Sequence, residues 1–151
     1  MRDNIETDYL IFVSSDGKKT GLDIFNERIK KNKWPIYSKT PQQLNIKQGK
    51  KVVFYIAGAG EKKQSFVGTA QIKSIIDNNT VSTDPNQEFK SVLFFIEFKN
   101  LNVFNEEIKI KEHLNKLDFI KNKKKYGLYF QGGICKINQE SYEYILQKSY
   151  S

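Results

Sequence analysis

Side chains capable of chemistry are few, and their spacing does not assemble a catalytic or metal-binding group. The one histidine, His113, lies beside Glu112, and no second histidine or cysteine cluster is present to complete a zinc site. Cys135 lies in an apolar run typical of an inert core thiol; a Cys135–His113 nucleophile pair is the alternative. Glu106 and Glu107 are adjacent, so on a strand they would point to opposite faces. We therefore expect no metal and no cofactor, and no constellation here demands an enzyme.

The glycines at 58 and 60 lie between two strand-like runs, 52–57 and 66–72. A phosphate-cradling loop would instead need a strand-to-helix turn followed by Lys and Ser or Thr. The pattern predicts a β-hairpin, with residues 52, 54 and 56 on one face and 53 and 55 on the other. Gly68 in the second run weakens a strand unless another backbone or a ligand approaches closely there.

The charge of the chain indicates a polyanionic partner. Lys and Arg number 25 against 17 Asp and Glu, which gives +8 and a pI near 9.4; nucleic acid is the commonest partner of such a chain. Nearly all the cations are lysines, which suit phosphate better than base edges. The alternative is that they only solvate the surface. If nucleic acid binds, we expect lysines of three segments to contact phosphate. These segments are the two sides of residues 34–37, the turn of the expected hairpin and the basic loop at 121–125, and the lysines are Lys33, Lys39, Lys62, Lys63, Lys123, Lys124 and Lys125.

Trp34 has two interpretations. Pro35 biases it to an extended conformation, between the basic end of an expected helix and the polar residues 37–39. An aromatic face can stack on a nucleobase, and an extruded base is then read by hydrogen bonds to its edge. The alternative is an ordinary core tryptophan.

The remaining pattern predicts one domain over residues 1–151. Eleven Phe and eight Tyr exclude a disordered chain, the longest apolar run is too short to cross a bilayer, and one cysteine fits a reducing compartment. We expect a cytoplasmic monomer. The expected elements are strands at 9–13, 52–57, 66–72, 89–98, 104–110, 126–130 and 134–137, helices at 20–31 and from 138, a helical turn after Pro41 and a long loop at 77–88.

Two stretches resemble a known family. YLIFVSS, a helix and then KWPIYSKTPQQLNIKQGKKVVFYIAGAGEKKQSFVGTAQI are similar to the EVE domain, a PUA-like relative of the YTH domains. LNKLDFIKNKKKYGLYFQGGICKINQESYEYIL resembles the ending of EVE proteins, so the similarity extends from Tyr9 to Leu146. The resemblance implies an α+β, PUA-like fold: a curved β-sheet closing towards a β-barrel, with flanking helices and a base-sized pocket.

The resemblance also implies site residues. Trp34 matches the first cage tryptophan of YTH domains, and the loop at 77–89 lacks the further tryptophans that YTH readers place there, which favours a flat stacking pocket. The polar end of the first strand, the hairpin tip and the C-terminal turn would border it. The pocket predicted in this way comprises Ser14, Ser15, Asp16, Trp34, Tyr37, Ser38, Ala57, Gly58, Ala59, Phe130 and Gln131.

EVE and YTH domains are associated with reading modified bases in DNA or RNA. We therefore expect a non-catalytic nucleic-acid-binding domain that reads a modified, cytosine-derived base, with a nuclease or restriction-type partner. One alternative is an ASCH-like enzyme of the PUA superfamily that acts on a small nucleoside derivative, for which only Asp16 and Lys39 offer an acid–base pair. Another is an interaction domain that binds no nucleic acid.

Overall fold

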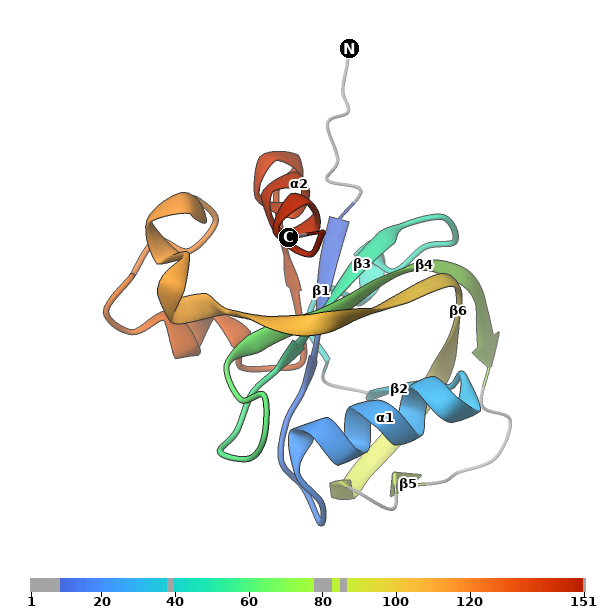
Figure 1. Ribbon diagram of the computed structural model, residues 1–151. Helices are drawn as coiled ribbons and strands as arrows, with labels where there is room; N and C mark the ends of the chain where they lie inside the picture. The colour runs from blue at the N-terminus through green and yellow to red at the C-terminus, as the bar shows by residue number, and fades with distance from the viewer. Residues whose placement is uncertain (1–8, 38–39, 78–82, 85–86, 151) are drawn as a thin grey trace.

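The computed structural model describes residues 9–37, 40–77, 83–84 and 87–150, which form a curved mixed sheet with two α-helices beside it (Figure 1). The sheet order is β2-β6-β4-β3-β1-β7, with β5 paired to β6. Strands β1 and β3 are parallel, and the other pairs are antiparallel. The elements are β1 (Tyr9–Ser14), α1 (Gly21–Lys31), β2 (Trp34–Tyr37), η1 (Gln43–Asn45), β3 (Lys51–Ile56), β4 (Ser65–Asp77), β5 (Thr83–Asp84), β6 (Gln87–Lys109), η2 (Ile110–Glu112), η3 (Leu114–Lys116), η4 (Tyr126–Phe130), β7 (Ile134–Lys136) and α2 (Gln139–Lys148). The expected α+β class, with a curved sheet forming a half-barrel, is confirmed.

Alternate residues of β3 enter two separate cores, as the sequence predicted. Val52, Phe54 and Ile56 belong to one buried cluster, whereas Val53 and Tyr55 belong to the other. The two clusters therefore cover opposite faces of the same sheet, because successive side chains of a strand point to opposite sides.

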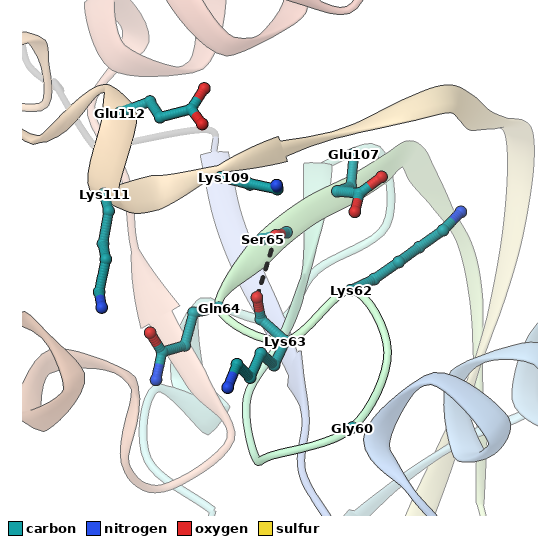
Figure 2. A pocket seen from close by; sticks show the side chains of 9 residues that line it. All are labelled: Gly60, Lys62, Lys63, Gln64, Ser65, Glu107, Lys109, Lys111 and Glu112. Carbon is teal, nitrogen blue, oxygen red and sulfur yellow. Dashed lines mark hydrogen bonds between the residues drawn. The ribbon is translucent and has the colours of Figure 1, made fainter.

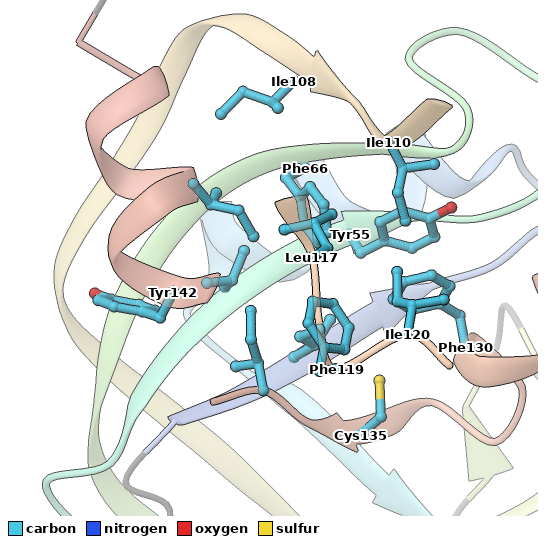
Figure 3. Close-up of a cluster of buried hydrophobic side chains, with 14 of the residues drawn as sticks. Tyr55, Phe66, Ile108, Ile110, Leu117, Phe119, Ile120, Phe130, Cys135 and Tyr142 are labelled. Atoms are coloured by element: carbon cyan, nitrogen blue, oxygen red, sulfur yellow. The ribbon is translucent and has the colours of Figure 1, made fainter. Parts of the chain in front are cut away.

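Aromatic rings pack against one another in both cores, together with aliphatic side chains. On the face covered by α1, the Phe54 ring packs edge-on against Phe25, with centroids 5.2 Å apart, and against Phe98 at 5.1 Å. On the other face, Tyr55 stacks on Phe130 at 3.9 Å, and residues of α2 complete the cluster (Figure 3).

Side-chain caps start both helices at the residues that the sequence indicated. The Thr20 hydroxyl accepts a hydrogen bond from the Asp23 N–H at 3.3 Å, and the Asn138 amide oxygen accepts one from the Ser141 N–H at 2.9 Å. Helix α1 ends at Lys31, where Asn32 adopts a left-handed conformation. These local signals were sufficient because a cap acts within one turn.

Three predicted segments were wrong. Residues 126–130 form the 3₁₀ helix η4, since β7 already occupies the edge of β1. Residues 104–110 are not a separate strand, because β6 continues from Gln87 to Lys109. The expected loop at 77–88 includes β5 and the start of β6; its residues 78–82 and 85–86 lie outside the described residues. Neither helix of the described part is long and apolar enough to span a membrane.

Gly68 lies on β4 where the backbone of β6 passes close to it. A Cβ at this position would lie 2.8 Å from the backbone carbonyl oxygen of Asn102 on β6. The close approach anticipated for this glycine is therefore another backbone, which cannot move aside as a flexible side chain could. The pairing also shifts register between Phe66 and Gly68.

We expect Gly68→Ala to destabilise the fold by about 1–3 kcal/mol, because the added methyl group forces β4 away from β6. The matched control is Gly127→Ala, since a Cβ there meets no atom within 4 Å. That control should be neutral or slightly stabilising. Urea unfolding of the two variants measures the difference, and equal stability would contradict the close approach.

Candidate nucleic-acid interface

The polar end of β1 and the tip of the β3–β4 hairpin, two of the pocket borders that the resemblance implied, lie in contact. The Ala57 N–H donates to the Ser14 carbonyl at 2.9 Å, while the buried Ser14 hydroxyl donates to the Gly21 carbonyl at 2.7 Å. The Asp16 carboxylate accepts from two backbone N–H groups, that of Gly21 at 2.8 Å and that of Ala59 at 3.2 Å. Asp16 therefore ties the β1–α1 loop to the hairpin tip.

Two glycines allow this close fit. A Cβ on Gly21 would lie 2.8 Å from the carbonyl oxygens of both Ser14 and Ala57. Gly58 has a φ of +101°, and a Cβ there would lie on the Asp16 carboxylate. Ser15, Asp16, Gly58 and Ala59 are all exposed, so this contact leaves a polar rim at the surface, which we name the Asp16 rim after these four residues.

Trp34 lies in the core rather than at a pocket wall. Its side chain is 3% exposed, stacks on Phe54 with centroids 5.3 Å apart and has the Arg28 guanidinium 4.8 Å from its ring centre. The expectation of an open indole face is wrong, because β2 pairs with β6 and places the indole among the rings beneath α1. The packing supports the alternative of a core tryptophan.

Two of the predicted pocket residues, Trp34 and Phe130, belong to different cores. Phe130 is 3% exposed and stacks on Tyr55, so the sheet separates it from Trp34. Tyr37 is half-buried, and its hydroxyl accepts from Arg28 at 2.9 Å. Gln131 is exposed beside the closing turn, and Ser38 lies outside the described residues. A base-binding role for the rim residues stays a prediction.

A pocket of about 420 Å³ opens between the turn that precedes β4 and the end of β6 (Figure 2). It brings the predicted phosphate contacts Lys62 and Lys63 together with Lys109 and Lys111, which the sequence reasoning missed. The pairing of Ser65 with Lys109 creates this juxtaposition, and no local spacing signals it. The pocket is lined by Gly60, Lys62, Lys63, Gln64, Ser65, Glu107, Lys109, Lys111 and Glu112.

The remaining predicted lysines are dispersed. The Lys33 ammonium lies 4.7 Å from the centre of the Phe95 ring, and Lys123 donates to the Leu117 carbonyl at 2.6 Å. Lys124 and Lys125 are exposed in the basic loop, and Lys39 lies outside the described residues. Of the predicted phosphate contacts, Lys62 and Lys63 line the pocket described above.

The groups considered for catalysis have structural partners. Burial raises the pKa of the Cys135 thiol, which is 7% exposed. His113 Nδ1 lies 2.7 Å from the Tyr144 hydroxyl, and burial lowers the pKa of its imidazole. Within the described residues, no three His, Cys, Asp or Glu side chains are grouped so as to hold a metal ion.

The curved sheet with its two helices is the fold of PUA-like domains of the EVE and YTH type. The chain belongs to the EVE domain family, whose model matches residues 9–148. No curated protein matches the chain in sequence.

Three solved structures are similar in fold. The N-terminal domain of Staphylothermus marinus McrB has 11% identity and a TM-score of 0.51, with 98% of each chain covered. Rpa0253 from Rhodopseudomonas palustris has 13% identity and a TM-score of 0.59, covering 94% of this chain and 92% of that one. Human THYN1, in complex with DNA that contains 5-methylcytosine, has 15% identity and a TM-score of 0.56, covering 95% and 98%.

The Asp16 contact generates a prediction. Asp16→Ala removes both acceptors, and we expect a loss of about 1–2 kcal/mol in the free energy of unfolding because hydrogen bonds to a charged group are lost. Amide hydrogen exchange should accelerate at Gly21 and Ala59. The exposed neighbour Ser15→Ala is the control and should change neither quantity. Unchanged exchange at Ala59 would contradict the tie between loop and hairpin.

The packing of Trp34 generates a second prediction for this region. Trp34→Ala should lower the free energy of unfolding by roughly 3–5 kcal/mol, the usual cost of removing a buried large aromatic ring. Tyr150→Ala, at an aromatic residue that is 75% exposed, should stay within about 0.5 kcal/mol. A Trp34 variant that melts normally but binds oligonucleotides less tightly would instead support base stacking.

Proposed function

We propose that this chain is a nucleic-acid-binding domain that reads a modified base derived from cytosine. Membership in the EVE family supports the proposal, and so does the fold shared with human THYN1, whose structure holds 5-methylcytosine DNA. The shared fold with the McrB N-terminal domain adds a second neighbour over nearly the full chain length. A nuclease or restriction-type partner belongs to the same proposal.

The observation that carries the proposal is the lysine-lined pocket. Among the described residues, Lys62, Lys63, Lys109 and Lys111 form no ion pair with a carboxylate. Their charge is therefore available to phosphate, in a chain whose net charge is +8. Phosphate contacts of this kind supply affinity and orientation without reading sequence.

Base reading needs a second, less flexible surface, and we assign it to the Asp16 rim. Ala59 of the rim and Gly60 of the pocket are consecutive in the hairpin turn, so the two surfaces adjoin. The hydrogen bonds from the Gly21 and Ala59 N–H groups to the Asp16 carboxylate hold the rim in position. In this proposal the exposed side chains of Ser15 and Asp16 face the base edge. Discrimination on this proposal depends on the rim and not on stacking against Trp34, which is buried.

The alternative enzyme has less support. Asp16 accepts two backbone hydrogen bonds, which accounts for its carboxylate structurally. Its expected partner Lys39 lies outside the described residues. No observation therefore favours an acid–base pair over a binding surface.

The test is binding to matched duplexes that carry cytosine or 5-methylcytosine at one position, measured by fluorescence anisotropy. If four lysines each contact a phosphate, the slope of log K against log salt should be about −3.6, so affinity falls roughly 150-fold between about 50 and 200 mM salt. Burial of one methyl group should favour the modified duplex by about 0.8 kcal/mol, or roughly fourfold.

The unmodified duplex is the control for base reading, and the salt series is the control for phosphate contact. Affinity that stays flat with salt would contradict the polyanion-binding proposal. The duplexes compared should also include one with 5-hydroxymethylcytosine. A steep salt dependence with equal affinity for modified and unmodified duplexes would contradict the reading of a modified base but not the binding of nucleic acid.

A further inference from the structure

We propose that the pocket beside the β3–β4 turn binds one phosphate group, through the side-chain amide of Gln64 together with the ammonium groups of Lys63 and Lys111. The phosphate could come from a nucleic-acid backbone, in which case the inference rests on the proposed function, or from a free mononucleotide. The shared chemistry is a tetrahedral oxyanion that accepts hydrogen bonds from several donors at once.

Gln64 makes the pocket selective for a ligand that accepts hydrogen bonds. Its amide oxygen accepts a hydrogen bond from the Tyr126 hydroxyl at 2.6 Å. That bond leaves the amide nitrogen, a donor only, without a hydrogen-bond partner among the described residues. A tyrosine hydroxyl is protonated at neutral pH, and burial raises the pKa of Tyr126 further, so this hydroxyl donates. Tyr126 therefore fixes the amide with its N–H groups available to a ligand.

The backbone holds Gln64 in place. Its N–H donates to the Ile56 carbonyl at 2.6 Å, and its carbonyl accepts from the Ile110 N–H at 3.0 Å, which joins the turn to the end of β6. Lys62 and Gln64 have φ values of 57° and 54°, in the left-handed region that few non-glycine residues adopt. Such conformations persist where the surrounding structure determines them, and they are frequent at ligand-binding sites.

The charges of the pocket are unevenly placed. In the view of Figure 2, the nitrogen ends of Lys63, Gln64 and Lys111 lie toward one side of the turn, whereas the carboxylates of Glu107 and Glu112 lie away from them. The carboxylates would repel an anion. A phosphate group would therefore bind on the side where the nitrogen ends lie. The volume of about 420 Å³ exceeds that of a bare phosphate and lies in the usual range for small-molecule sites.

The test combines binding measurements with nuclear magnetic resonance titration of the full chain. The probes are inorganic phosphate, cytidine 5′-monophosphate and, as the oligonucleotide, the short duplex that carries 5-methylcytosine. We expect the side-chain amide resonance of Gln64 to shift and saturate with the nucleotide or the oligonucleotide. Gln64→Glu, which can still accept from Tyr126, should abolish saturable binding at the pocket because it replaces a donor by an anion.

The lysines are tested against a variant of equal charge. Lys63→Ala/Lys111→Ala should weaken oligonucleotide binding about tenfold and make the salt slope shallower by about two, because up to two phosphate contacts are lost. The matched control is Lys73→Ala/Lys99→Ala, at exposed lysines of β4 and β6 outside the pocket. Tyr126→Phe should weaken binding less than Gln64→Glu, because it only releases the orientation of the amide.

The outcomes separate the two proposals. Oligonucleotide binding that the pocket pair weakens more than the control pair supports a backbone phosphate in the pocket. Saturable shifts at Gln64 with the mononucleotide or inorganic phosphate, but no oligonucleotide binding, support the pocket and overturn the proposed function. If the oligonucleotide binds, both lysine pairs weaken it equally and the Gln64 amide resonance does not shift, the phosphate pocket is overturned and the proposed function is not. If no probe binds, both the pocket and the proposed function are overturned.

Discussion

Strands β4 and β6 pair from Ser65 opposite Lys109 at one end to Asp77 opposite Phe94 at the other. The pairing requires a glycine at position 68, where the Asn102 carbonyl passes too close for any side chain. Since β4 also pairs with β3, it connects the hairpin to the long β6 strand and so to β2. The same register places Lys109 beside the hairpin turn, so the lysine-lined pocket is a direct consequence of how the sheet closes.

Burial of both faces of this sheet limits where a ligand can bind. Each face carries its own aromatic core, and the rings with the best chemistry for stacking, Trp34 and Phe130, are used to fill the two cores. A nucleobase could reach either ring only by displacing core packing. We therefore place the proposed binding surfaces, the Asp16 rim and the pocket, in the loops at the sheet ends.

Features set by local chemistry were predictable from the sequence, whereas features set by strand pairing were not. The caps at Thr20 and Asn138 and the face alternation of β3 follow from patterns within a few residues. The resemblance to the EVE family located the meeting of the β1 end with the hairpin tip. Neither indicated Lys109 or Lys111 as neighbours of Lys63, because alternation gives the faces of a strand but not its register with a partner distant in sequence.

The hairpin turn is anchored at both ends, and this links the two proposed surfaces. Asp16 holds Ala59 on one side, while Ile56, Ile110 and Tyr126 hold Gln64 on the other. A ligand that bridges the rim and the pocket would meet donors already fixed in position, so little conformational entropy is lost at the turn on binding. The flexible lysines around it contribute charge with little geometric selectivity. In the two proposals, affinity and discrimination therefore come from different atoms in and beside the same short turn.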